Sequence, residues 1–287
     1  MRQATLYAAG IGMMFLAWGK HRVNSYSTPT PFNAGDEDRS ASHANRIVDE
    51  WTDFLTRYAG QAWEGQDVLE LGPGGTLGTG ALILTKGAIS YQAVDAFPLA
   101  ERIDLGFYEA LLNGVSQKEP LLQAIGARDK PPFIYSVDPS FRVDIAAGEN
   151  RFSRLVSCAA FEHFDDVADT IARMSRVAQP GAIACIRVDF STHSRWLRDK
   201  DPNNIYRYPD WLYWSLPFPG KPNRVRPDAL MKMFEAEGWE DIEFHPVRVA
   251  SPEYCATANG KLAKSFRRPE ARMEVLSGII LGRRTAA

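Results

Sequence analysis

The sequence predicts an α/β protein built on a mostly parallel, doubly wound sheet. Short apolar runs that suit buried strands alternate along the chain with stretches of helical period. One of these runs, residues 67–71, passes directly into a glycine-rich turn that opens the next helix. A turn of this kind lies at the carboxyl edge of a parallel sheet and brings the backbone close to a bound ligand.

The N-terminal residues 4–19 carry no charge, and their large apolar side chains recur at near-helical spacing. This pattern predicts a helix with one apolar face. The run is shorter than the roughly 20 apolar residues that a membrane span needs. We therefore favour a docked or membrane-surface helix over a true span, and we rank a cleaved signal peptide last.

Residues 23–38 are rich in Ser, Thr, Pro and Asn, which predicts an irregular connector. Ser40 or Ser42 is then expected to cap a helix over 43–58. The resulting division of the chain is an N-terminal apolar segment and linker, 1–39, followed by one main domain, 40–287.

The remaining elements alternate as the fold class requires. Helices are expected over 77–86, 99–112, 119–125, 167–177 and 228–237. Strands are expected over 67–71, 91–95, 133–135, 154–158, 182–189, 242–249 and 275–281. An aromatic and basic stretch over about 194–226 predicts an insertion that lies over the ligand edge of the sheet as a lid.

The glycine loop favours a cationic ligand over a diphosphate. Gly72, Gly74 and Gly78 allow sharp backbone turns and close approach to a ligand. A dinucleotide turn, G-x-G-x-x-G, would need a small residue at the place of Leu77. Glu70, two residues before the loop, would repel a diphosphate and attract a cation.

The pattern E-x-G-x-G-x-x-x-G over residues 70–78 resembles the first motif of the class I S-adenosylmethionine-dependent methyltransferases, whose ligand carries an ammonium and a sulfonium. Later stretches agree with this resemblance in the expected order: a second strand ending in Asp95, a strand followed by Glu162-His163, and a Pro180-Gly181 turn before the next strand. The resemblance implies a Rossmann-like, seven-stranded sheet and S-adenosylmethionine as cofactor.

The resemblance also implies which residues hold the cofactor. They are Glu70, Gly72, Gly74, Gly78, Asp95, Asp144, Ser157 and His163. The Asp95 carboxylate would accept hydrogen bonds from both ribose hydroxyls, and His163 would orient the loop beside the methionine end. Asp144 either contacts the adenine amino group or is a turn acid, and both interpretations stay open.

Composition narrows the class of partner. A net charge of −2 without a long basic run argues against nucleic acid. The aromatic lid suits a small-molecule or glycan acceptor. Three isolated cysteines predict no disulfide framework, which suits the cytoplasm, with a peripheral membrane contact through residues 4–19 as a further expectation.

The expected reaction is methyl transfer to a hydroxyl or amine, with His193 as the base. Glu162, His163 and His193 carry suitable metal ligands. Metal-using relatives have another acid at the place of Ala159, however, so no metal is expected. Two other functions stay open, a non-catalytic scaffold that binds the cofactor and a nicotinamide-dependent oxidoreductase.

Overall fold

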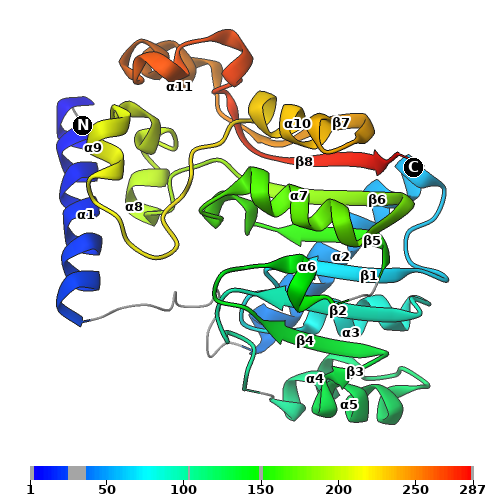
Figure 1. Cartoon of the computed structure of the whole chain (residues 1–287). Coiled ribbons are helices and arrows are strands. Elements are labelled where there is room, and N and C mark those ends of the chain that lie inside the picture. The colour runs from blue at the N-terminus through cyan, green and yellow to red at the C-terminus, as the bar shows by residue number, and fades with distance from the viewer. Residues whose placement is uncertain (1–2, 25–36, 103, 149–150, 286–287) are drawn as a thin grey trace.

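A computed structural model of the chain describes residues 3–24, 37–102, 104–148 and 151–285 (Figure 1). Its centre is one sheet with the strand order β3-β4-β2-β1-β5-β6-β8-β7. The strands β1, β2, β4, β5 and β6 are parallel, and β3 and β8 run antiparallel to their neighbours. The strand bounds are β1 Asp67–Leu71, β2 Ser90–Asp95, β3 Asp129–Lys130, β4 Phe133–Val137, β5 Phe152–Cys158, β6 Ala178–Asp189, β7 Trp239–Val249 and β8 Val275–Arg284.

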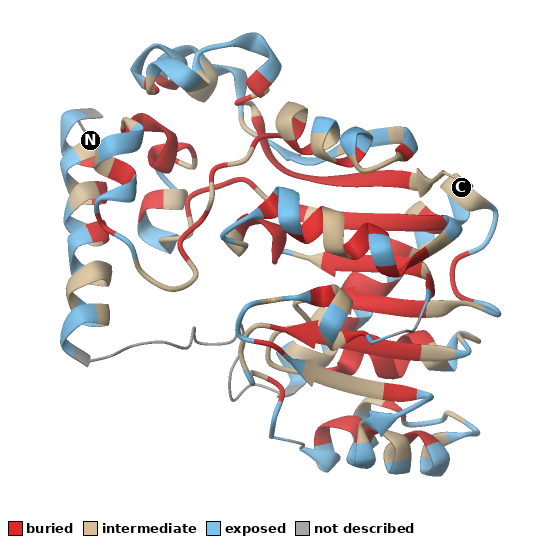
Figure 2. Ribbon diagram, viewed as in Figure 1, coloured by how far each residue is buried: buried red, intermediate tan, exposed pale blue. Residues whose placement is uncertain are grey.

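Helices cover both faces of the sheet, each over its own apolar core. One face carries α2 (Glu37–Ala59), α3 (Gly78–Thr85), α4 (Leu105–Leu111) and α5 (Lys118–Ala127). The other carries α6 (Val143–Ala146), α7 (Val167–Val177) and α10 (Pro227–Ala236). Figure 2 shows the central strands buried between these layers. The predicted doubly wound α/β fold is confirmed.

Three details differ from the sequence-based expectation. The sheet has an eighth, two-residue strand, β3, which pairs only with β4 at the sheet edge. The Pro180-Gly181 turn lies within β6, where the pairing with β5 shifts register. Helix α2 extends back to Glu37, so Ser40 and Ser42 lie inside it and the predicted cap is wrong. Residues 25–36 of the expected connector lie outside the described residues.

Helix α1 (Gln3–Asn24), the lid and a second insertion form a separate group beside the sheet (Figure 1). The lid contains α8 (Arg195–Arg198), η2 (Asn204–Arg207) and α9 (Asp210–Trp214). The second insertion, between β7 and β8, was not predicted and contains α11 (Pro252–Ala258), η3 (Asn259–Lys261), η4 (Lys264–Phe266) and η5 (Pro269–Ala271). Side chains of all three segments share one apolar cluster.

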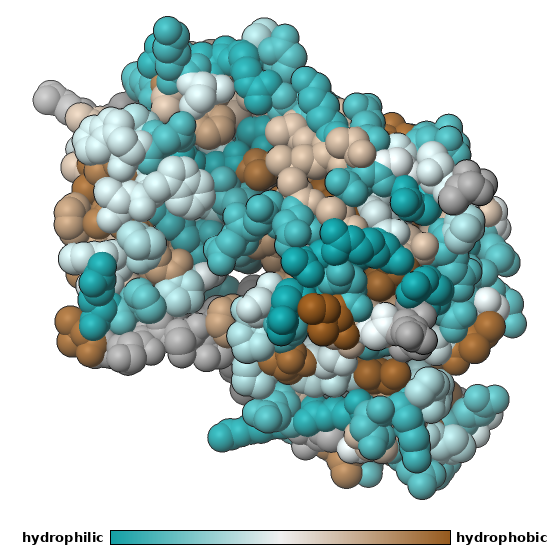
Figure 3. All heavy atoms as spheres, in the orientation of Figure 1, coloured by the Kyte–Doolittle hydropathy of each residue, from teal (hydrophilic) through white to brown (hydrophobic). Residues whose placement is uncertain are grey.

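Helix α1 is docked against the lid. Its side chains Leu6 and Met14 are buried, and Asn204 of the lid donates a hydrogen bond of 3.0 Å to the Leu6 carbonyl. Among the described helices, none is both long and apolar enough to cross a bilayer. Hydrophobic residues reach the surface at the α1 edge (Figure 3), including Phe15 and Leu16. Contact of this edge with a membrane surface stays a prediction.

Candidate functional site

The glycine loop after β1 is held against the two neighbouring strands. The Gly72 N–H donates to the Val94 carbonyl of β2 at 2.8 Å. Gly72 has φ +69, and a Cβ built on it would lie 2.5 Å from the Cβ of Ala160. Gly74 has φ +78 and faces open space. Only glycine suits both turns, and the loop backbone is left open toward a ligand.

Gly78 and Gly80 serve close packing of α3 instead. A Cβ on Gly78 would lie 3.1 Å from Ala44 and from Phe107, and Gly78 is buried. A Cβ on Gly80 would lie 2.2 Å from the ring of Tyr91, which means that α3 approaches β2 too closely for any side chain there. The sequence analysis did not single out Gly80, although a glycine inside a predicted helix, here in its first turn, is a signal for such packing.

Glu70 lies beneath the loop, almost fully buried. Its Oε2 accepts hydrogen bonds of 2.6 Å from the hydroxyls of Thr79 in α3 and Tyr91 in β2. Burial raises the pKa of Glu70 to about 7, although these two hydrogen bonds act in the opposite direction. The carboxyl group therefore joins β1, α3 and β2 at the base of the loop.

Two acids end neighbouring strands beside the loop. Asp95, at the end of β2, accepts hydrogen bonds from the backbone N–H groups of Gly74 at 3.3 Å and Phe97 at 3.1 Å. Burial raises its pKa to about 6 against the effect of these bonds. Asp138 follows β4, and its N–H donates to the Asp95 carbonyl at 3.0 Å. The sequence analysis missed Asp138, which is recognisable as the acid that follows an apolar strand and precedes Pro139.

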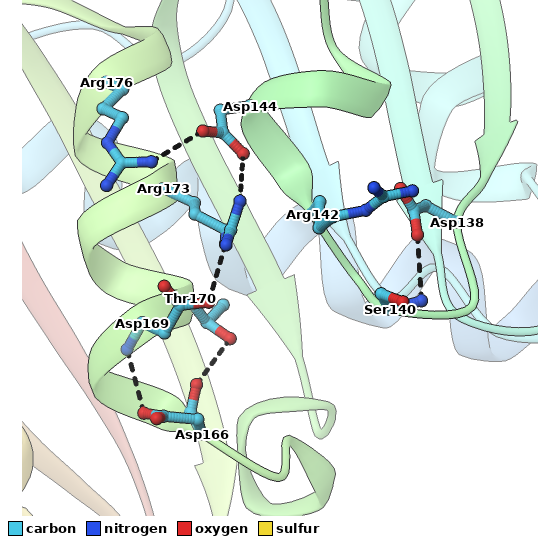
Figure 4. A network of polar contacts seen from close by, with 9 residues as sticks. All are labelled: Asp138, Ser140, Arg142, Asp144, Asp166, Asp169, Thr170, Arg173 and Arg176. Atoms are coloured by element: carbon cyan, nitrogen blue, oxygen red, sulfur yellow. Dashed lines mark hydrogen bonds and ion pairs between the residues drawn. The ribbon is translucent and has the colours of Figure 1, made fainter.

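Asp144 lies in α6 and connects it to α7 (Figure 4). Its two carboxylate oxygens accept hydrogen bonds from Arg173 at 2.9 Å and Arg176 at 2.8 Å. Burial raises the pKa of Asp144, but the two guanidinium groups outweigh that effect and lower it. Of the two interpretations left open, these contacts favour the structural one. Asp138, in the same view, also binds the backbone N–H of Ser140.

Ser157 is fully buried in β5. Its hydroxyl donates to the carbonyl of Leu71, the last residue of β1, at 2.8 Å. The serine thus fixes the start of the glycine loop from below.

Glu162, His163 and His193 meet at the carboxyl ends of β5 and β6. The rings of the two histidines lie edge to face with centroids 4.6 Å apart, and Nε2 of His193 lies 3.7 Å from Oε1 of Glu162. Burial lowers the pKa of His163. Burial also acts to lower the pKa of His193, but Glu162 outweighs it and the pKa is raised. His163 binds the Gly220 carbonyl, so the structure connects it to the lid.

A cavity of about 230 Å³ lies between α1 and the lid. Met13 and Met14 line it from α1, and His193 and Tyr208 line it from the other side. Lys221 also reaches this cavity, but its Nζ lies 3.1 Å from the Leu216 carbonyl, and burial lowers its pKa to about 8. The wall is mainly apolar and has His193 at one end.

The basic residues of the lid serve mainly to hold it together. The buried Arg207 pairs with the buried Asp201 at 2.7 Å. The guanidinium of Arg224 lies 3.9 Å from the centroid of the Tyr213 ring. Arg226 donates to three backbone carbonyls near η5 and β8. These three cations are therefore occupied by structural contacts within the lid segment or to the second insertion and β8. A role of this segment as a substrate lid stays a prediction.

Comparison with known proteins adds a family. The methyltransferase domain family matches residues 42–243, and no match was found among curated proteins. A protein from Galdieria sulphuraria, proposed to be a sarcosine dimethylglycine methyltransferase, has the same fold with a TM-score of 0.50 and 16% identity, over 96% of this chain and 98% of that one.

Two further solved structures resemble the chain over only part of their length. Phosphoethanolamine N-methyltransferase 2 of Haemonchus contortus, in complex with S-adenosylmethionine, has a TM-score of 0.47 and 13% identity, over 83% of this chain and 53% of that one. A protein of Nostoc punctiforme proposed to be an O-methyltransferase has a TM-score of 0.47 and 13% identity, over 85% of this chain and 56% of that one. This chain therefore spans about half the length of both.

The matched segment includes the glycine loop, Asp95 and the Glu162-His163 pair, all on the carboxyl edge of one doubly wound sheet. It also covers well over half of the chain. The chain belongs to the methyltransferase domain family, and its sheet has the class I methyltransferase fold.

Proposed function

We propose that this protein transfers the methyl group of S-adenosylmethionine to a hydroxyl or amine of a small, largely apolar acceptor. The observation that carries the proposal is the position of His193. This side chain follows β6 on the same sheet edge as the glycine loop, and it also lines the apolar cavity between α1 and the lid. A group in that position stands between a cofactor site and an acceptor site.

The cofactor would lie across the ends of β1, β2 and β4. The Asp95 carboxylate would bind the two ribose hydroxyls, and the backbone of Gly72 and Gly74 would lie against the methionine part. For the adenine amino group we propose Asp138 in place of Asp144, since Asp138 adjoins Asp95 at the ends of β2 and β4. Its own oxygens accept from the Ser140 N–H at 2.9 Å and from Arg142 at 3.0 Å, so the adenine amino group would share one of them. Glu70, Gly78, Ser157 and His163 would support this site from behind.

The sulfonium is already an activated methyl donor, so alignment with the acceptor would supply much of the acceleration. Good alignment is worth about 7–11 kcal/mol. His193 would accept the proton of the acceptor, a role that contributes typically 10²- to 10⁴-fold. A mainly apolar cavity favours a small ring or chain over a glycan, whose many hydroxyls would each need a partner.

Two experiments test the proposal. Calorimetric titrations with S-adenosylmethionine, S-adenosylhomocysteine and NADH should show binding of the first two only, and binding of NADH alone would refute the cofactor assignment. Transfer of a labelled methyl group to a panel of apolar alcohols, phenols and amines should then give product. Cofactor binding without transfer across a broad panel would favour the scaffold function.

A further inference from the structure

Two histidines and a glutamate form a compact cluster at the ends of β5 and β6. Glu162 and His163 belong to η1 (Phe161–His163), which follows β5, and His193 follows β6. One ligand atom from each side chain lies within 4.8 Å of the other two. Protein ligands bind Zn²⁺ at about 2.0–2.2 Å, so modest side-chain movements would bring these three atoms around one ion.

Backbone carbonyls orient both imidazoles. Nδ1 of His163 lies 2.6 Å from the Gly220 carbonyl, and Nδ1 of His193 lies 3.0 Å from the Ser191 carbonyl. A carbonyl only accepts, so the hydrogen bonds assign the ring proton to Nδ1 and leave a lone pair on Nε2 in each neutral ring. Histidines that bind metals are held in this way, with the other nitrogen donating to a carbonyl or carboxylate.

The carboxylate of Glu162 has no hydrogen-bond donor among the described residues. Its side chain is 4% exposed, and both oxygens are buried. Its Oε1 faces Nε2 of His193 at 3.7 Å. Two lone pairs that face each other in a buried place need a positive charge between them, and a single proton on His193 would still leave the second oxygen unpartnered.

We propose that Glu162, His163 and His193 bind one divalent transition metal ion. Two imidazoles and a carboxylate suit ions such as Zn²⁺, Fe²⁺, Mn²⁺ or Co²⁺ and leave coordination positions open. His193 also lines the acceptor cavity, so an open position would face that cavity. The sequence analysis expected no metal because Ala159 supplies no fourth ligand. In the proposed site, the same absence leaves the ion a free position for a further ligand.

The metal proposal does not depend on the acceptor or on methyl transfer. It does change the part proposed for His193, because the Nε2 lone pair would bind the ion instead of a proton. His163 would be a ligand as well as a contact to the lid through Gly220.

Titration with Co²⁺ tests the proposal, since the visible absorption of bound Co²⁺ reports its ligands. The full chain, dialysed against a chelator, is expected to bind one Co²⁺, and Zn²⁺ should displace it. Glu162→Gln preserves the shape and removes the charge, and it should weaken Co²⁺ binding about ten-fold or more. His193→Gln, at a side chain that is 33% exposed, should do the same and guards against misfolding of the first variant.

His245→Gln is the matched control, because His245 faces Glu243 at 2.7 Å on the exposed strand β7. This variant should bind Co²⁺ as the wild type does. S-adenosylhomocysteine titration of each variant reports the fold and tests the cofactor assignment separately. Absence of stoichiometric Co²⁺ binding in the wild type would overturn the metal proposal, as would unchanged binding in both Glu162→Gln and His193→Gln.

Discussion

Replacing Asp95 by asparagine tests the cofactor site most directly. The carboxylate ends β2 beside the glycine loop and already accepts N–H groups from Gly74 and Phe97. In the proposed complex it also accepts both ribose hydroxyls. Asparagine has nearly the same shape but only one acceptor oxygen and no charge. The variant therefore removes the interaction with the cofactor while disturbing the packing little.

The expected loss follows from the hydrogen bonds involved. Hydrogen bonds to a charged group are worth about 1.5–3 kcal/mol, and each 1.4 kcal/mol is ten-fold in affinity. Asp95→Asn should therefore weaken S-adenosylhomocysteine binding about 10- to 150-fold at pH 8, as measured by calorimetry. Thermal unfolding of the free variant checks that the fold is retained.

The pH dependence sharpens the test. Burial raises the pKa of free Asp95 to about 6, and the complex favours the ionised form, so affinity should rise with pH and level off above about 7. At pH 5 only about a tenth of the carboxyl groups are ionised, which predicts about ten-fold weaker binding than at pH 8. Glu70 and Tyr135 also interact with this charge, and they are retained in Asp95→Asn. Wild-type affinity that does not change with pH, or an Asp95→Asn variant that binds as tightly as the wild type, would refute the reasoning.

Three other substitutions test the parts around the cofactor site. Gly10→Ala should displace α1, because the new Cβ would lie 1.9 Å from the Tyr208 hydroxyl, and should lower the free energy of unfolding by about 1–3 kcal/mol in chemical denaturation. Gly12→Ala, with open space around it, is the matched control and should be neutral or slightly stabilising. Equal losses of unfolding free energy in both variants would contradict the docking of α1. Glu70→Gln should remove a pH dependence of stability. Burial raises the folded-state pKa of Glu70 to about 7, so the wild type should lose up to about 3 kcal/mol of unfolding free energy as pH rises from about 4.5 to 7. A variant whose stability has the same pH profile as the wild type would count against this burial cost. His193→Ala should lower methyl transfer by about 10²- to 10⁴-fold while S-adenosylhomocysteine affinity stays within two-fold, and unchanged turnover would exclude it from the reaction.

The local sequence pattern was sufficient to predict the central sheet and its glycine loop. Apolar or partly apolar runs predicted every strand except the two-residue β3. For the buried strands this works because they must be apolar whatever surrounds them, whereas β7 is mostly exposed and only its partly apolar run marked it. The spacing of Gly72, Gly74 and Asp95 likewise depends on one strand-turn-helix unit and the next strand. These features are local, and the structure places them as the spacing indicates.

Features that depend on contacts between distant segments could not be predicted in this way. Asp138 is one acid among many until β4 is known to pair with β2. The ion pairs of Asp144 come from α7, some thirty residues away. The need for a glycine at position 10 is visible only when α1 is seen to pack on Tyr208, about two hundred residues later in the chain. The short helices over 252–271 have too few turns to show a period, so the sequence contained no clear signal for them.

The cavity at His193 has one wall that lies outside the residues matched by the methyltransferase domain family. Met13 and Met14 come from α1, outside the matched residues 42–243, whereas the glycine loop and Asp95 lie inside them. In the proposed complex, α1 would therefore help to shape the acceptor site without belonging to the segment that holds the cofactor. If the cavity is the acceptor site, as proposed, substitutions of Met13 and Met14 should change which acceptors are methylated while leaving the affinity for S-adenosylhomocysteine unchanged.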